Sequence, residues 1–251
     1  MISGHILPSS LMTTVNITPG LIWRKDMRVK VLRQRSPVSE PYWQEFDYDP
    51  HGNITVAGML DELNYKDDLK DITGESAPRI QWECSCLQGM CGGCAMVINH
   101  IPRLACETFI ADLKGDTIIL EPLSKFFTLS DLVVDRGIIQ ENLKKADAFI
   151  EEYNYEPSAD HDRMYSVAKC LKCGLCLEVC PNYKDGKRFY GAMFANDCYL
   201  ISARSGKHEE EIRKSYGEHF AKGCSKSLSC MDVCPVKIET LASISRMNRG
   251  K

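Results

Sequence analysis

Apolar and polar residues alternate along the first part of the chain that shows a regular pattern. The alternation from Met27 to Arg33 predicts a β-strand. A second strand is predicted from Tyr42 to Tyr48, and the composition of Asp49 to Asn53 is typical of a turn. Further short strands are predicted at Ala95 to Ile98 and at Thr117 to Leu120.

One helix is predicted between the second and third of these strands. Thr55 is its candidate N-cap, because a threonine side chain can accept a hydrogen bond from an amide of the first helical turn. Strands, one helix and a long loop predict a small mixed α/β domain over residues 26–126, after a leader (residues 1–25) of unknown role. The apolar residues of this helix recur at helical spacing: Val56, Met59, Leu60 and Leu63.

The pattern becomes helical after residue 126. Thr128 to Asp131 has the form of a capping box ahead of an apolar run. The polar segment from Glu151 to Arg163 is predicted to be a surface connection. A closing helix after Pro235 carries an apolar stripe that we expect to pack in the core. We therefore predict a helical domain over residues 127–251, and an α+β fold for the chain. The stripe comprises Ile238, Leu241, Ile244 and Met247.

Composition narrows the classes of function. The 251 residues are 44% hydrophobic and 26% charged, which is ordinary for a globular protein. A net charge of −3 gives no footprint for nucleic-acid binding. No apolar stretch approaches the roughly 20 residues of a membrane span, and the first twenty residues do not resemble a secretory signal. We expect a cytoplasmic location.

Thirteen cysteines change this picture. A disulfide framework is the first alternative, but such frameworks belong to small secreted domains, and nothing in the chain indicates export. We therefore favour metal or cluster ligation.

The first cysteine group lies between the predicted helix and the third strand. Cys86, Cys91 and Cys94 have the C-x4-C-x2-C spacing of plant-type 2Fe–2S sites, with Cys106 as the distant fourth ligand. Four thiolates on zinc are the alternative, but the x4 gap fits zinc poorly. Cys84 lies outside the pattern; it is either an unligated buried thiol, which we favour, or an alternative to Cys86.

Glycines accompany this motif. Gly89, Gly92 and Gly93 are expected to adopt backbone angles closed to other residues, so that the loop wraps closely around a cluster. Their amides can then approach the sulfurs and help to set the reduction potential.

The second group begins with the run from Cys170 to Pro181, C-L-K-C-G-L-C-L-E-V-C-P. In bacterial-type ferredoxins the first three thiolates of such a run hold one cluster, and the fourth holds another. An incomplete copy follows from Cys224 to Pro235. Crossing the ligands predicts a 4Fe–4S cluster on one set and a further cluster on the other. The sets are Cys170, Cys173, Cys176 and Cys234, and Cys180, Cys224 and Cys230.

The last set lacks one ligand. A complete repeat would place a cysteine where the chain has Ser227. Three thiolates leave one corner of a cubane unheld, so our hypothesis is a 3Fe–4S cluster. The alternative is a four-iron cluster whose last iron binds water, Ser227 or Cys198.

Five segments together resemble one family, the iron–sulfur subunit of succinate dehydrogenase and fumarate reductase, over residues 26–249. The stretch from Cys180 looks most like the branch found in Gram-positive bacteria. The segments are Cys86–Cys94, Leu104–Thr108, Cys170–Pro181, Cys224–Pro235 and Ser243–Arg249.

The resemblance implies a plant-type ferredoxin (β-grasp) domain followed by an all-helical, bacterial-ferredoxin-like domain with two clusters. It implies a separate flavoprotein subunit with FAD, which interconverts succinate and fumarate. The 2Fe–2S cluster takes electrons from the flavin, the 4Fe–4S cluster passes them on, and the 3Fe–4S cluster meets quinone at a membrane anchor subunit that carries haem in some members. This chain then has no catalytic residue of its own and lies on the cytoplasmic face of the membrane.

The sequence departs from the family pattern in three places, and two of them concern the quinone end. Leu87 stands where arginine is common, and Ser225 where histidine is frequent. The segment Tyr183–Asp185 lacks the tryptophan that helps to bind quinone in well-known members. Pro181 and Asn182 remain as candidate quinone contacts.

Two other functions are alternatives. One is the iron–sulfur subunit of a soluble thiol-linked fumarate reductase or heterodisulfide reductase. The other is a binding module in which the clusters are only structural, although three clusters exceed what such a role requires.

Overall fold

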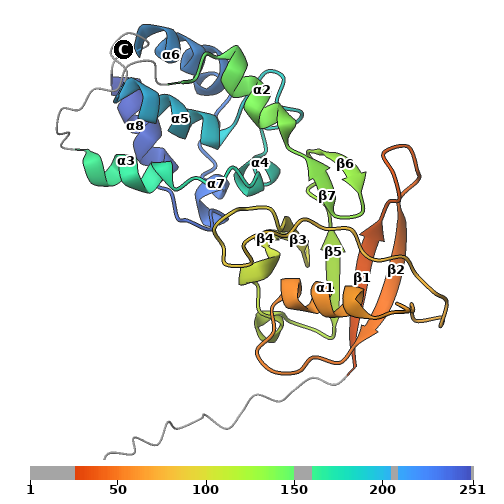
Figure 1. The fold of residues 1–251 in the computed structure, drawn as a ribbon. Helices are drawn as coiled ribbons and strands as arrows, with labels where there is room; N and C mark the ends of the chain where they lie inside the picture. Colours follow the sequence, from red (N-terminus) through yellow and green to blue (C-terminus); the bar gives the residue numbers. More distant parts are fainter. Residues whose placement is uncertain (1–25, 150–159, 205–208, 250–251) are drawn as a thin grey trace, which may run out of the picture.

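The computed structural model describes residues 26–149, 160–204 and 209–249 (Figure 1). The predicted leader and most of the predicted connection from Glu151 to Arg163 lie outside the described residues. The last residues of that connection, from His161 onward, form the first turn of helix α3 (His161–Ala168) instead of a loop.

The first part of the chain forms a five-stranded sheet in the order β2-β1-β5-β3-β4. The strands β1 and β5 are parallel, and the other neighbours are antiparallel. The predicted bounds of β1, β2 and β3 are confirmed, and β5 is one residue longer than predicted. Sequence reasoning missed β4, which contains Pro102. The strands are β1 (Met27–Arg33), β2 (Tyr42–Tyr48), β3 (Ala95–Ile98), β4 (Ile101–Leu104) and β5 (Thr117–Glu121).

Helix α1 (Val56–Tyr65) packs on this sheet, as Figure 1 shows. The Thr55 hydroxyl accepts a hydrogen bond from the Gly58 amide at 3.2 Å, which confirms the predicted N-cap. Two short helical turns follow β4 and return the chain to β5: η1 (Ala105–Glu107) and η2 (Ile110–Asp112). The predicted apolar face is buried: Val56, Met59, Leu60 and Leu63.

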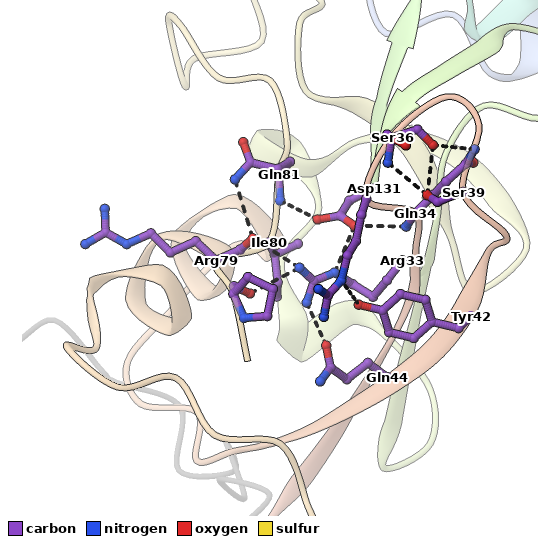
Figure 2. A network of polar contacts seen from close by, with 12 residues as sticks. Arg33, Gln34, Ser36, Ser39, Tyr42, Gln44, Arg79, Ile80, Gln81 and Asp131 are labelled. Atoms are coloured by element: carbon purple, nitrogen blue, oxygen red, sulfur yellow. Dashed lines mark hydrogen bonds and ion pairs between the residues drawn. The ribbon is translucent and has the colours of Figure 1, made fainter. Parts of the chain in front are cut away.

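The predicted capping box at Thr128–Asp131 is wrong. These residues belong to a hairpin of β6 (Phe127–Ser130) and β7 (Val133–Asp135). Asp131 occupies the turn, and its carboxylate accepts hydrogen bonds from distant backbone amides, of Gln34 at 2.9 Å and of Gln81 at 2.8 Å (Figure 2). The carboxylate thus bonds to amides that are distant in the chain, and not to the amides of a helical turn that follows it. Residues 127–135 are therefore not helical.

The described elements after this hairpin are all helices. Helix α5 is central, since it packs against α8, α6 and α3 (Figure 1). The helices are α2 (Gly137–Lys145), α3, α4 (Leu175–Glu178), α5 (Ala192–Ser202), α6 (Glu209–Tyr216), the π-helical turn η3 (Gly217–Ala221), α7 (Ser229–Asp232) and α8 (Thr240–Arg249).

The predicted stripe of the closing helix is buried in part. Ile238, Ile244 and Met247 are at most 5% exposed, but Leu241 is 42% exposed. The expectation for Leu241 is wrong because it lines a surface cavity described below.

Two buried clusters form the core. The first extends from the sheet through Leu132 to Leu177 and Tyr183, so the two predicted domains share packed side chains. The second surrounds α5. No helix among the described residues has the length and apolar character needed to cross a membrane.

Candidate metal centres

The first cysteine site lies in the loop between α1 and β3, together with η1. Cys94 Sγ and Cys106 Sγ are 3.3 Å apart. Cys86 Sγ accepts hydrogen bonds from the amides of Gln88 at 3.4 Å and Met90 at 3.3 Å. Two glycine amides complete the set: Gly89 donates to Cys106 Sγ at 3.3 Å, and Gly93 to Cys91 Sγ at 3.4 Å.

These amide donors favour thiolate sulfur, which is the form that ligates metal. The Gln88 and Met90 amides lower the pKa of Cys86 to about 7. Cys94 differs, because burial raises its pKa to about 12. A thiol with such a pKa requires a bound cation or cluster to hold it deprotonated at neutral pH. The donor set fits an iron–sulfur cluster.

Two of the three glycines have the predicted backbone angles. Gly89 and Gly92 have φ angles of +68° and +75°, which favour glycine. A Cβ atom on Gly89 would lie 2.2 Å from the Glu107 carboxylate, and one on Gly92 would lie 2.7 Å from Cys173 Cβ. For Gly93 the predicted backbone angle is wrong, since its φ is not positive and its Cβ would meet no atom closer than 3.6 Å, but its amide approaches a cysteine sulfur as predicted.

Cys84 is exposed, so the expectation of a buried thiol is wrong. It lies on the loop that enters the first site, and partial burial raises its pKa.

The second site is a cavity of about 390 Å³, part of it open to solvent. Burial raises the pKa of Cys173 to about 11, while the nearby Arg136 guanidinium acts in the opposite direction. The pKa of Cys176 is also raised well above its ordinary value, by burial. Cys173 is buried and the other three predicted ligands are half-buried, so the four thiols are largely shielded from water. The cavity is lined by all four predicted ligands, Cys170, Cys173, Cys176 and Cys234, and also by Cys230.

One ion pair connects the loop of the second site to α5. Lys172 has a φ of +54° and pairs through Nζ with the carboxylate of Asp197 on α5. Burial raises the pKa of Asp197, and the Lys172 charge opposes that rise. The Lys172 charge also favours the thiolate of Cys170.

The third site is a cavity of about 410 Å³ whose lining includes Cys180, Cys224 and Cys230. Ser227 lies in the same lining, at the place that the repeat predicts for a fourth ligand. Cys198, in contrast, is fully buried on α5 within the second core cluster, and burial raises its pKa.

The two candidate quinone contacts directly follow Cys180, which lines the third cavity, but neither of them is part of that lining. Pro181 and Asn182 are both exposed. Asn182 Nδ2 donates to the Gly223 carbonyl at 2.6 Å, and Ser225 Oγ donates to Asn182 Oδ1 at 2.9 Å. Asn182 therefore joins the loops that carry Cys180 and Cys224. Tyr183 is only 1% exposed and packs on Phe126, away from the surface.

The three sites form a series. The first and second meet where Gly92 lies against Cys173 and Leu171. The second and third meet at Cys230, which lines both cavities. Sequence reasoning did not foresee the first of these meetings, because the two motifs are far apart in the chain.

The arrangement of side chains gives no further support for the individual ligand assignments. Within residues 26–149, 160–204 and 209–249, no group of three or more His, Cys, Asp or Glu side chains is placed to hold one metal ion. The individual ligand assignments therefore remain predictions, which rest on spacing, amide donors and cavity lining.

Comparison with known families and proteins finds iron–sulfur domains over the same parts of the chain. A "2Fe-2S iron-sulfur cluster binding domain" matches residues 28–141, and a "4Fe-4S dicluster domain" matches residues 166–238. The chain is 31% identical over 237 residues to the succinate dehydrogenase iron-sulfur subunit of Bacillus subtilis, with 90% of this chain and 92% of that protein covered. It is 27% identical over 237 residues to the fumarate reductase iron-sulfur subunit of Wolinella succinogenes, with 89% and 95% covered.

A solved structure shares the fold. A chain of the Mycobacterium smegmatis Sdh1 complex in the apo form superposes with a TM-score of 0.71 at 22% identity, and the match covers 90% of this chain and 97% of that one. The arrangement of the sheet and the helices is thus that of a known protein architecture.

Proposed function

The chain belongs to the family of iron–sulfur subunits of succinate dehydrogenases and fumarate reductases, and on this premise we propose that it relays single electrons between an FAD-bearing flavoprotein subunit and quinone at a membrane anchor. One observation carries the proposal: the three cysteine sites form a series, with Gly92 between the first two and Cys230 between the last two. A structural staple does not require such a series.

Each site is assigned one cluster. Clusters supply one-electron carriers, which divide the two-electron change of the flavin into single steps. The chain's own residues provide the thiolates, the amide donors and the exclusion of water that tune each potential. The assignments are 2Fe–2S on Cys86, Cys91, Cys94 and Cys106; 4Fe–4S on Cys170, Cys173, Cys176 and Cys234; and 3Fe–4S on Cys180, Cys224 and Cys230.

The finer fold assignment follows the same premise. We assign the sheet with α1 to the plant-type (β-grasp) ferredoxins, as a domain over residues 26–126. We assign the helices from α2 onward to a two-cluster, bacterial-ferredoxin-like domain within residues 127–251, with the β6–β7 hairpin between the two.

The two ends of the series differ in the surfaces that they present. At the third site Leu228 and Leu241 are 36% and 42% exposed on the cavity lining, which favours contact with an apolar partner. We assign this surface to the membrane anchor, on the cytoplasmic face, with quinone near Pro181 and Asn182. At the first site Leu87 and Met90 are exposed, and we assign that surface to the flavoprotein.

Affinity purification from detergent-solubilised membranes tests the proposal. The expected result is a complex with a flavoprotein and a hydrophobic anchor that transfers electrons between succinate and a quinone. A soluble complex active with thiols would instead support the thiol-linked reductase. If the purified chain holds clusters that accept no electrons from a flavoprotein, the structural module would be supported.

Two substitutions test the anchor surface. Leu228→Glu and Leu241→Glu place charge at the third site and are expected to release the flavoprotein-bound subunit from membranes. Val38→Glu is the matched control, because Val38 is 94% exposed in the turn between β1 and β2 and lines none of the three sites. Equal membrane retention of all variants would contradict the assignment.

A further inference from the structure

Arg136 lies where the first and second cysteine sites meet. It is the single residue between β7 and α2, and its side chain is 17% exposed. Nη2 donates a hydrogen bond to the Gly93 carbonyl at 2.9 Å, and Nη1 pairs with Glu83 Oε2 at 2.8 Å. Nε is buried and has no hydrogen-bond partner among the described residues. One guanidinium therefore holds both ends of the first cysteine loop.

Gly92, next to the carbonyl that Arg136 holds, forms the contact between the two sites. A Cβ atom at Gly92 would lie 2.7 Å from Cys173 Cβ and 3.1 Å from both the Cβ and the carbonyl oxygen of Leu171. The backbone of the first loop thus touches a predicted ligand of the second cluster. Any displacement of the Gly92 segment changes the separation of the two sites.

Arg136 also places a positive charge beside both sites. Its guanidinium acts on the Cys173 thiol and contacts the loop that carries Cys91 and Cys94. Reduction adds negative charge to a cluster, so a nearby cation stabilises the reduced state, and a nearby carboxylate such as Glu83 opposes it.

We propose that Arg136 is a positioning residue for electron transfer between the first two clusters: it holds Gly92 against Cys173 and keeps a positive charge between the sites. The inference rests on the function proposed above. With clusters bound, one electron would pass from the reduced first cluster to the oxidised second cluster, and no bond would form or break.

The charge is tested by two substitutions with opposite expected effects. Arg136→Gln is expected to lower the reduction potentials of the first two clusters, and Glu83→Gln to raise them. The potentials are measured by redox titration of the purified complex, followed by electron paramagnetic resonance. The potential of the third cluster serves as an internal reference that neither change should move as far.

The position of Gly92 against Cys173 is tested separately from the charge of Arg136. Arg136→Lys keeps the positive charge but cannot donate from a planar fork to both acceptors. Gly92→Ala keeps Arg136 but introduces a Cβ atom where Cys173 lies. Both are expected to weaken the relaxation enhancement that the reduced second cluster exerts on the reduced first cluster, while Arg136→Lys leaves the potentials close to wild type.

Arg28→Gln is the matched control, because Arg28 on β1 pairs with Glu45 on β2 at 3.1 Å, away from the cysteine sites. Unchanged potentials in both Arg136→Gln and Glu83→Gln, or shifts in the same direction, would overturn the inference. If Arg136→Gln does not assemble, Glu83→Gln and Arg136→Lys still decide it. Absence of both clusters from the wild-type complex would overturn the proposed function itself, which is a distinguishable outcome.

Discussion

Arg33 Nε and Asp131 Oδ1 lie 3.0 Å apart in an ion pair whose two side chains are each 2% exposed (Figure 2). Arg33 ends β1, and Asp131 turns the β6–β7 hairpin at a φ of +45°. The remaining guanidinium nitrogens bond to Gln44 and to the carbonyls of Pro78 and Arg79. The pair therefore joins the sheet, the hairpin and the segment that leads into the first cysteine site.

Removal of one member of this pair is expected to destabilise the protein strongly. Asp131→Asn should lower the free energy of unfolding by about 3–5 kcal/mol, because the Arg33 charge remains buried without its partner. Asparagine tolerates the left-handed backbone, so the change isolates the charge from strain. Urea denaturation of the purified protein measures the effect.

The exposed pair Arg28–Glu45 provides the control for this prediction. Arg28→Met should cost only about 0–1 kcal/mol, because solvent screens an exposed pair. The explanation fails if Asp131→Asn costs no more than Arg28→Met.

The third site can be tested at the position where a fourth ligand is absent. Ser227 lies in the lining of the third cavity with Cys180, Cys224 and Cys230. Ser227→Cys is expected to add one iron per chain and to remove the paramagnetic signal of the 3Fe–4S cluster that we propose for this site. Iron analysis and electron paramagnetic resonance of the oxidised protein measure both.

Ser227→Ala is the control for that prediction, since it supplies no thiolate and should keep the signal. A silent oxidised spectrum from fully loaded wild-type protein would mean that the site already holds four irons.

Spacing and alternation predicted much of this molecule, and their failures share a cause. Strands such as β1 and β2 were found because their side chains alternate between buried and exposed positions. The capping box at Thr128–Asp131 failed because its acidic residue bonds to amides that are distant in the chain. Local pattern carries no information about such partners.

The same limit applies to the cysteine sites. The spacing of the two cysteine repeats predicts that Cys234 joins Cys170, Cys173 and Cys176, and these four line one cavity. The contact of Gly92 with Cys173 joins two motifs that were each recognised alone, and Arg136 belongs to neither motif. Side chains that join motifs have no spacing rule, so they required the structure.

Tyr183 gives a prediction on pH dependence. Burial raises its pKa from 10.0 to about 12, so the folded state binds a proton that the unfolded state loses first. The stabilising contribution of the neutral phenol is therefore complete below pH 10 and is lost as pH rises towards 12. Tyr183→Phe should reduce this alkaline loss, measured as the unfolding free energy between pH 9 and pH 11 (about one unit either side of the ordinary value).

Near neutral pH the same change should cost little, because Tyr183 Oη has no hydrogen-bond partner among the described residues. Tyr216→Phe is the comparison: its pKa is also raised to about 12 by burial, but Tyr216 Oη bonds to Asn248 Oδ1 at 3.2 Å, so it should lose about 0.5–1.5 kcal/mol. Quinone reduction should survive Tyr183→Phe, because the side chain lies inside the first core cluster. A specific loss of that activity would place Tyr183 at the quinone site.

Glu178 joins helix α4 to the segment between β5 and β6, and its removal gives the last prediction. Its carboxylate accepts hydrogen bonds from the Ser124 amide at 3.0 Å, the Ser124 hydroxyl at 2.6 Å and the Lys125 amide at 3.1 Å. Glu178→Ala removes the acceptor of these bonds and is expected to cost about 0.5–1.5 kcal/mol of unfolding free energy, because water can reach the exposed Ser124 donors.

Ser124→Ala is the matched control, because it removes one donor and leaves both amides bonded to Glu178. It should cost less than Glu178→Ala in the same urea titration. Because α4 lies between Cys173 and Cys180, Glu178→Ala should also speed the loss of the second and third clusters during incubation in urea, followed by visible absorbance. Equal rates in the two variants would mean that Glu178 stabilises only the loop at Ser124 and does not fix α4 against the sheet domain.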